Sequence, residues 1–151
     1  MSNRRKPTIK TILFPTDFSE ASEHAATTAF LLARVHGAKL KVIHVMDTTT
    51  EAAGFYVPHL SYDNLDREML LSAEAMLKKF CAKFFKNYKQ LDFAVITGTP
   101  YKEILKATKA VSADMVVMGS YRKQALEKLF LGSTTERVLR KSTCPVTVVP
   151  E

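Results

Sequence analysis

A short run of small and hydroxyl-bearing residues, Gly132-Ser133-Thr134-Thr135, has the composition of an anion-binding helix start. A glycine lets the backbone approach a phosphate closely, and the N–H groups and dipole of a following helix attract negative charge. Ser133 and Glu136 also have the S-x-x-E spacing of a capping box, in which the two side chains satisfy those N–H groups. The run therefore predicts either a phosphate site or a self-capped helix, and a bound phosphate could replace the cap.

Two further polar segments follow apolar runs and could contribute to the same site. Pro15-Thr16-Asp17 follows one run, and Gly119-Ser120 follows another. The connection that begins at Gly119 is longer than most links between a strand and a helix. It carries three cations, Arg122, Lys123 and Lys128. We interpret this connection as a basic cradle for an anion.

An alternation of apolar runs and helical patterns positions these segments. Five runs are typical of buried strands, over residues 11–14, 40–46, 91–96, 115–118 and 146–149. The alternation indicates parallel βαβ units with right-handed crossovers. The predicted fold is a doubly wound, open α/β sheet. In such a sheet, ligands bind beyond the carboxyl ends of the strands, where the winding reverses.

Capping residues and apolar spacing predict four helices. Ser19 is expected to cap a helix that ends at His36-Gly37, and Thr99 is expected to cap one with Pro100 at its first position. A third helix covers 134–141. The long helix after a loop over 47–65 carries an apolar stripe made of Leu70, Leu77, Phe80, Cys81, Phe84 and Tyr88.

Length and composition exclude several classes of protein. The chain has 151 residues, of which 46% are hydrophobic and 25% charged, as in a single folded domain, with residues 1–8 expected to form a flexible basic arm. No apolar run is long enough to span a bilayer, and the one nearest the N-terminus is too short for a signal peptide. Cys81 and Cys144 make neither a disulfide framework nor a metal site. A cytoplasmic location with reduced thiols is the expectation.

The formal net charge is +7, and the second half of the chain carries the excess. Residues 76–151 hold 14 basic and 6 acidic side chains. Such a basic half suggests an anionic partner, although a solvated lysine-rich face is the commoner explanation. Aromatic residues do not interleave with the basic ones, and no nucleic-acid-binding signature is visible, so we do not expect nucleic acid as the partner.

Four segments together carry a resemblance to the universal stress protein family. They are Pro15-Thr-Asp-Phe-Ser19, Val116-Val-Met-Gly-Ser120, Leu131-Gly-Ser133 and Cys144-Pro-Val-Thr-Val-Val-Pro150. Each motif alone is weak, but the four occur in the family's order over about residues 8–150. The resemblance implies a five-stranded sheet in the order 3-2-1-4-5 and, as in many members, adenine-nucleotide binding.

The family's nucleotide motif, G-x2-G-x9-G-[ST], is matched in part. Gly119 matches the first glycine and Gly132-Ser133 the last pair, whereas Arg122 replaces the second glycine. Glycine there would allow a close backbone approach and a positive φ, which arginine disfavours. Arg122 could fold over the ligand and pair with phosphate oxygens, or it could fill the pocket.

By position, the resemblance implies contacts for particular residues. Asp17, with Pro15 and Thr16 beside it, would bind the adenosine end, and the Val45 backbone would meet the adenine edge. Met118 would pack against the nucleoside. The phosphates would be lined by Gly119, Gly132, Ser133, Thr134 and Thr135, and Ser120 is also expected at the site. The alternatives are that Asp17 merely caps a helix and that the Val45 and Met118 side chains belong to the core.

Three functions follow from these patterns. The first is a homodimeric, adenine-nucleotide-binding regulator of a stress response that takes ATP or AMP, with or without Mg²⁺. The second is a nucleotide-independent dimeric interaction module, which Arg122 favours. The third is a slow ATP hydrolase or self-phosphorylating protein, which lacks a Walker A pattern and a kinase catalytic loop. The homodimer is expected through the apolar edge strand 145–150, because an exposed edge needs covering. The four histidines show no metal-ligand spacing.

Overall fold

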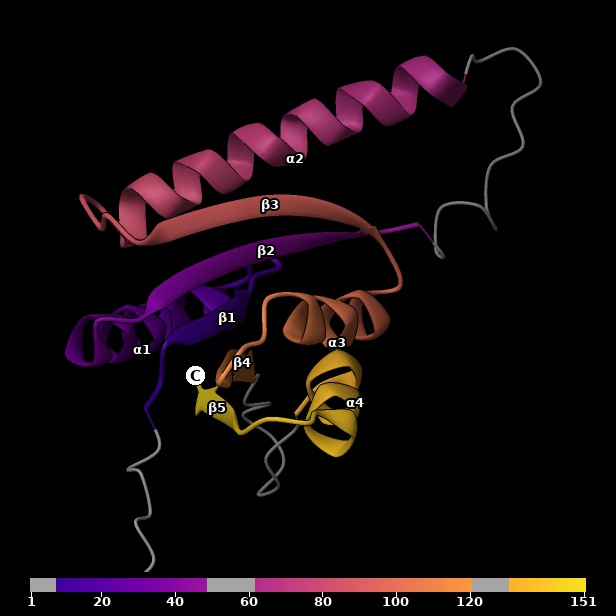
Figure 1. Cartoon of the computed structure of the whole chain (residues 1–151). Helices are drawn as coiled ribbons and strands as arrows, with labels where there is room; N and C mark the ends of the chain where they lie inside the picture. The colour runs from indigo at the N-terminus through magenta and orange to yellow at the C-terminus, as the bar shows by residue number, and fades with distance from the viewer. Residues whose placement is uncertain (1–7, 49–61, 121–130) are drawn as a thin grey trace, which may run out of the picture.

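A computed structural model describes residues 8–48, 62–120 and 131–151. Five parallel strands form one sheet in the order β3-β2-β1-β4-β5, which confirms the predicted fold and strand order (Figure 1). The strands are β1 (Thr11–Pro15), β2 (Lys39–Asp47), β3 (Leu91–Gly98), β4 (Met115–Ser120) and β5 (Val146–Pro150). The order steps outward from β1 in both directions, so the winding reverses between β1 and β4.

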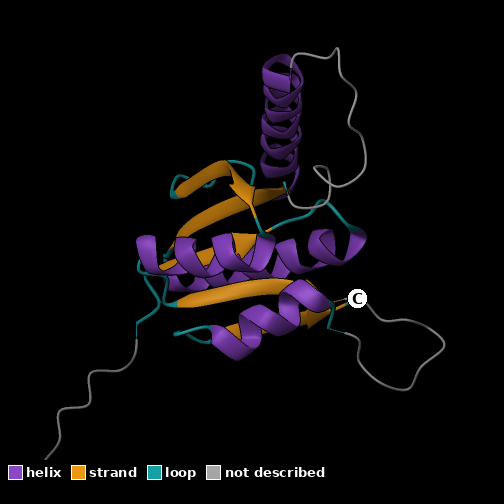
Figure 2. Ribbon diagram, turned by 90° about the vertical axis from the view of Figure 1, so that its right-hand side faces the viewer, coloured by secondary structure: helices purple, strands orange, loops and turns teal. Residues whose placement is uncertain are grey.

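Four helices cover the two faces of the sheet. They are α1 (Glu20–His36), α2 (Tyr62–Phe84), α3 (Pro100–Ala110) and α4 (Ser133–Lys141). Side chains of β1 alternate between the faces: Ile12 and Phe14 pack with residues of α1 and α2, whereas Leu13 packs with residues of α3 and α4. Figure 2 shows α2 projecting beyond the rest of the described chain.

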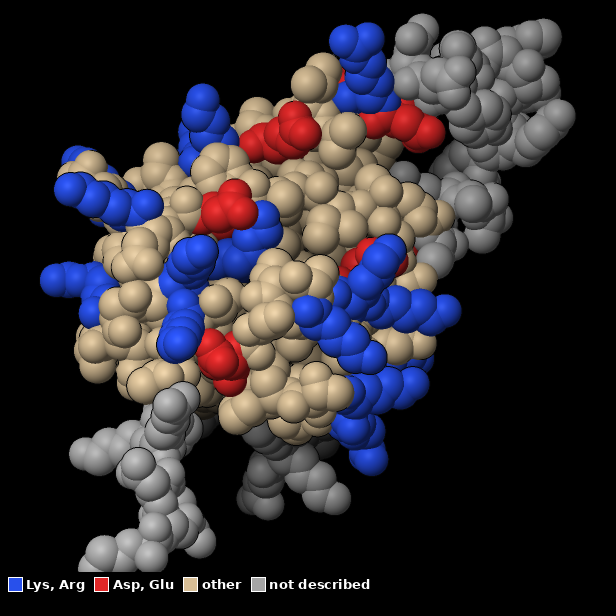
Figure 3. Space-filling model, in the orientation of Figure 1, with Lys and Arg blue, Asp and Glu red and all other residues tan. Residues whose placement is uncertain are grey.

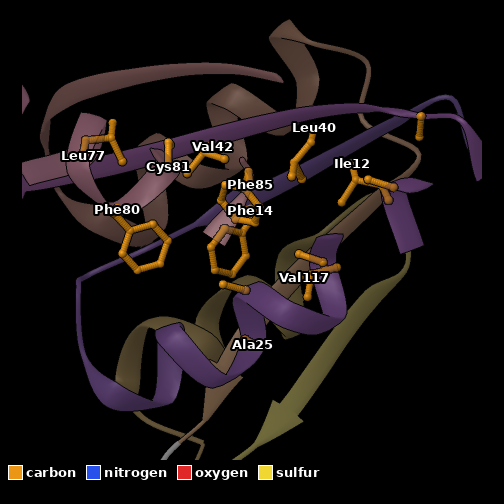
Figure 4. Packing of buried hydrophobic residues seen from close by; sticks show 14 residues of the cluster. Ile12, Phe14, Ala25, Leu40, Val42, Leu77, Phe80, Cys81, Phe85 and Val117 are labelled. Carbon is orange, nitrogen blue, oxygen red and sulfur yellow. The ribbon is translucent and has the colours of Figure 1, made fainter. Parts of the chain in front are cut away.

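The larger core lies between the sheet and helices α1 and α2. Phe14 of β1 stacks on Phe80 of α2, with ring centroids 6.2 Å apart, and meets Phe85 edge to face at 5.9 Å (Figure 4). Phe85 is among the largest fully buried side chains, although the predicted stripe passes over it and names Phe84 and Tyr88. Phe85 lies one residue beyond the last residue of α2, but it follows Cys81 by four residues and its N–H donates to the Cys81 carbonyl at 2.9 Å. It therefore continues the buried face of the helix that Leu77 and Cys81 form.

Local sequence signals account for most helix ends. The Ser19 side chain accepts a hydrogen bond from the Ser22 N–H at 3.2 Å, so it caps α1 as predicted, and Gly37 ends that helix in the left-handed conformation. Pro100 opens α3 after Thr99, whose side chain makes no capping bond. The predicted loop over 47–65 is shorter in the structure, because β2 runs to Asp47 and α2 begins at Tyr62.

The capping box predicted for α4 is wrong. Gly132, not Ser133, is the N-cap residue, and Ser133 is already helical. Glu136 does not reach back to the cap; its carboxylate instead pairs with Arg140 one turn later, at 2.9 Å from Nη2. Since Gly132 has no side chain, α4 begins without a side-chain cap, as a backbone anion site requires.

Candidate functional site

One pocket lies at the carboxyl ends of the strands, where the winding reverses. Its volume is about 350 Å³, and its walls come from the turn after β1, the ends of β2 and β4, and the starts of α3 and α4. This is the place that an open α/β sheet offers to a ligand, and the sequence predicts a site there.

Most of the predicted site residues meet at this pocket. It is lined by ten of them: Pro15, Thr16, Asp17, Val45, Met118, Gly119, Gly132, Ser133, Thr134 and Thr135. It is also lined by residues that the sequence analysis does not assign to the site: Ser19, Ala21, Ser22, Asp47, Pro100, Ile104 and Leu131. Asp47 lies two residues beyond Val45 on the same face of β2, so strand periodicity could have identified it. Arg122, Lys123 and Lys128 lie outside the described residues.

Hydroxyl groups hold the turn after β1 in place. The Thr16 N–H donates to the Ile43 carbonyl at 2.8 Å, which continues the pairing of β1 with β2. The buried Thr16 hydroxyl lies 2.9 Å from the Ser22 hydroxyl of α1. Asp17 Oδ1 accepts from the Ser19 N–H at 3.0 Å. Asp17 therefore supports the start of α1 and lines the pocket, so the two roles considered for it are compatible.

The start of α4 forms another wall of the pocket. Gly132 has φ +75° and ψ 153°, a conformation open almost only to glycine. The Thr135 hydroxyl donates to the Gly119 carbonyl at 3.2 Å and ties the first turn of α4 to the end of β4. The uncapped N–H groups of α4 and the helix dipole make this wall suitable for an anion.

Gly119 has a packing role that the motif alone does not reveal. A Cβ at this position would lie 2.4 Å from the Ala21 carbonyl oxygen, so glycine allows the backbones of β4 and α1 to touch. Any larger side chain would push α1 and the Asp17 turn outward. Gly119 thus lines the pocket and also fixes the distance between two of its walls.

Ser120 departs from the predicted site. Its side chain is fully buried, and it is not among the residues that line the pocket. Among the described residues, its hydroxyl oxygen has no hydrogen-bond partner. Along β4, Val116 and Met118 face α3 and α4, so strand alternation puts Ser120 on that side beneath the start of α4.

The pocket combines three kinds of surface. Asp17 and Asp47 supply carboxylate acceptors, α4 supplies N–H donors, and Val45, Met118 and Ile104 supply apolar wall. The described residues contain no cluster of His, Cys, Asp and Glu that could hold a metal ion. Such a pocket can bind a molecule that has hydroxyl or amino donors, a flat apolar part and a negative group. No helix in the described part of the chain is both long and apolar enough to cross a membrane.

Comparison with known proteins identifies the family to which this chain belongs. The chain belongs to the universal stress protein family, whose model matches residues 8–150. A universal stress protein of Thermus aquaticus is 33% identical over 142 residues, which cover 93% of this chain and 98% of the relative. The solved structure of MJ0577, a universal stress protein of Methanocaldococcus jannaschii, is similar at a TM-score of 0.80 and 27% identity, over 96% of this chain and 98% of the other.

Two more distant structures share the fold. One is a universal stress protein in complex with cAMP, with a TM-score of 0.59 and 21% identity over 95% of this chain and 98% of the other. The other is the universal stress protein from Archaeoglobus fulgidus in complex with dAMP, with a TM-score of 0.57 and 18% identity over 92% of this chain and 96% of the other.

Proposed function

We propose that this universal stress protein is a regulatory protein that binds ATP or AMP in the pocket and acts as a homodimer. One observation carries the proposal: the Asp17 turn and the start of α4, which has no side-chain cap, line the same pocket. A nucleotide has ribose and adenine donors as well as phosphates, so it needs both the acceptors and the N–H donors that these two segments supply.

The pocket residues fit an adenine nucleotide. The volume of about 350 Å³ lies within the range of small-molecule sites. The carboxylates of Asp17 and Asp47 accept from hydroxyl or amino groups, and the apolar wall of Met118 and Ile104 suits a nucleoside. The backbone of Gly132 and the first turn of α4 bind phosphate oxygens. The binding of cAMP and dAMP by two structural neighbours supports the same ligand class.

Calorimetric titration with ATP, ADP and AMP, with and without Mg²⁺, tests the proposal. We expect heat of binding with at least one of the three, and about tenfold weaker binding for Asp17→Asn, because a charge-assisted hydrogen bond is lost. Asp92→Asn is the matched control. It removes the same charge from an exposed carboxylate of β3, which pairs with Lys41 of β2 and does not line the pocket. No heat with any nucleotide would reject the proposal.

A second candidate function rests on Arg122. Because this residue stands where the family motif has glycine, the chain could instead be a nucleotide-independent interaction module. That function predicts that Arg122→Gly creates or strengthens ATP binding. Loss of existing binding in the same variant would instead make Arg122 a phosphate ligand and remove this candidate.

The homodimer is proposed through the edge strand 145–150. β5 is an outer strand, and its only strand neighbour among the described residues is β4. Nearby apolar side chains support the proposal: Leu31 and Val35 of α1 are 61% and 70% exposed, and Leu139 of α4 is 43% exposed. A strand paired with its two-fold copy would cover this edge and close the assembly.

A further inference from the structure

A histidine without a role in the predicted site lies directly beneath the turn that carries Asp17. His44 belongs to β2, on the face that packs against α1 and α2, and its ring nitrogen Nδ1 lies 2.8 Å from the Thr16 carbonyl oxygen. Since a carbonyl oxygen can only accept, Nδ1 must carry the proton and donate it. The ring does not line the nucleotide pocket; it lines a separate hollow beside α2.

The same ring supports an unusual backbone conformation at Phe18, two residues after Thr16. Phe18 has φ +63°, a left-handed conformation that costs a bulky residue about 1–2 kcal/mol. Its ring contacts that of His44, with centroids 4.4 Å apart and the planes tilted by 33°, and meets Phe80 of α2 edge to face at 5.8 Å. The Phe18 N–H donates to the Thr16 hydroxyl at 3.0 Å. The left-handed residue bends the chain from β1 into α1, and His44 and Phe80 offset its strain.

These contacts link the turn after β1 and His44 into one unit. Thr16 is held at its carbonyl by His44, at its N–H by Ile43 and at its hydroxyl by Ser22. Asp17 is the next residue, and its direction follows from the conformations of its two neighbours. Without the Nδ1 donor, the half-buried Thr16 carbonyl would lose this partner, and the peptide that joins Thr16 to Asp17 would be free to rotate.

We propose that His44 is a positioning residue of the nucleotide pocket: its Nδ1–H fixes the Thr16 carbonyl, so that the Asp17 carboxylate points at the nucleoside. This inference rests on the proposed function. It makes the exact place of the donor atom decisive, not merely the presence of a ring. Asparagine carries an amide N–H at nearly the position of Nδ1, whereas glutamine carries it one bond further out and leucine has none.

The test compares His44→Asn, His44→Gln and His44→Leu with the wild type by calorimetric titration of AMP and ATP. We expect affinity within about threefold of wild type for asparagine and a loss of about tenfold for leucine and glutamine, the equivalent of one hydrogen bond. AMP and ATP should lose the same factor, because the turn contacts the nucleoside that both share. Thermal unfolding identifies any variant that fails to fold. The remaining variants still show whether affinity depends on the position of the donor atom or on the packing of the ring.

Amide hydrogen exchange at Phe18 in the ligand-free proteins gives a readout independent of binding. We expect faster exchange in His44→Leu than in His44→Asn, because the turn loosens only when the donor is lost. Equal nucleotide affinity in wild type and His44→Leu would overturn the inference while leaving the proposed function intact. Equal losses in the asparagine and leucine variants would reduce His44 to a packing role and would also overturn it. If the wild type binds no nucleotide, the proposed function fails and the inference fails with it.

Discussion

At the scale of single residues, two glycines of the pocket act through different physical constraints. Gly119 is required for space, because the Ala21 carbonyl oxygen lies where a Cβ would be. Gly132 is required for conformation, because no atom of the described residues lies within 4 Å of its missing Cβ but its φ is +75°. The motif glycines therefore set how far apart the pocket walls lie and which way the chain turns, in addition to any close approach to a phosphate.

Gly132→Ala is predicted to weaken both the fold and nucleotide binding. Its backbone conformation costs about 1–3 kcal/mol for a residue with a Cβ, and relief of that strain would turn the first N–H groups of α4 away from the pocket. We expect a lower midpoint in urea denaturation and a loss of ATP affinity of about tenfold, since hydrogen bonds to a charged phosphate are lost.

Gly37→Ala is the matched control for that prediction. Gly37 also has a positive φ, +61°, and open space around its missing Cβ, but it ends α1 at the opposite end of the helix from the pocket. Its replacement should lower stability by about 1–2 kcal/mol without changing nucleotide affinity. Equal nucleotide affinity in Gly132→Ala and wild type would show that the α4 turn does not bind the phosphates.

At the scale of elements, one side chain beyond the end of α2 secures the end of α1. The Tyr88 hydroxyl lies 3.0 Å from the Ala33 carbonyl oxygen and 2.5 Å from that of Ala38. Its ring meets Phe30 edge to face at 5.5 Å. The Ala33 carbonyl also accepts from the backbone N–H groups of Gly37 and Ala38, so the hydroxyl adds a side-chain donor to a helix end that the backbone already closes. The link joins α1, β2 and the turn after α2.

Tyr88→Phe is predicted to destabilise the protein in a pH-dependent way. Loss of the donor should cost about 1–2 kcal/mol at neutral pH. Burial raises the pKa of Tyr88 above its ordinary value, so the folded state holds the phenol proton more tightly than the unfolded state. The stabilisation is therefore complete below about pH 10 and is lost as the pH rises through the folded-state pKa. Urea denaturation at neutral pH and above pH 10 should show the difference between wild type and variant shrinking; a constant difference would contradict the prediction.

The sequence predicts the elements well where local rules decide them. Apolar runs identify all five strands, and Ser19 caps α1 as its residue type suggests. The failures occur where tertiary packing decides. The S-x-x-E pattern fits Ser133 either as the cap residue or as the first residue of the helix. The conformation of Gly132 makes Gly132 the cap and puts Ser133 inside the helix. Phe85 is a different kind of miss: it follows Cys81 by four residues and Leu77 by eight, so helical spacing could have placed it on the buried face.

The candidate site shows the same division. Residues at the carboxyl ends of β1 and β4 could be assigned because parallel strands bring those ends together. The contributions of Ser22 and Ile104 depend on how α1 and α3 lie against the sheet, so nothing in their local sequence marks them. The role proposed for His44 likewise depends on the register of β2 with β1, which pairs Ile43 with Pro15 and so brings His44 beside the Thr16 carbonyl just after β1.

At the scale of the whole molecule, part of the positive charge can now be located. Figure 3 shows Lys and Arg side chains gathered over α3 and α4. These helices carry six cations, Lys102, Lys106, Lys109, Arg137, Arg140 and Lys141. Glu103 and Glu136 form ion pairs with two of the six, and such exposed pairs contribute little to stability. Lys109, Arg140 and Lys141 lie in the last turns, whereas the helices begin at the pocket, so this charge makes the outer surface of the two helices positive without lining the pocket.

The two edges of the sheet differ in a way that bears on assembly. Leu31 and Val35 are one turn apart on α1, whereas Phe30 faces α2 and contacts Phe85. α1 packs on β4 and β5, so the exposed pair lies away from α2, on the side of the β5 edge. At the other edge, Leu71 of α2 is 55% exposed in a groove beside β3. Each edge therefore carries exposed apolar side chains, but the β5 edge has them on both covering helices.

Val35→Lys is predicted to convert a dimer into a monomer without weakening the fold. The side chain is 70% exposed, so the monomer loses almost no buried contact, whereas a charge within an apolar interface is costly. Light scattering at micromolar concentration should give the mass of a dimer for the wild type and of a monomer for the variant. Leu71→Lys, an equivalent change at the β3 edge, should remain a dimer. A monomeric wild type would reject the homodimer, and loss of the dimer only in Leu71→Lys would move the interface from β5 to β3.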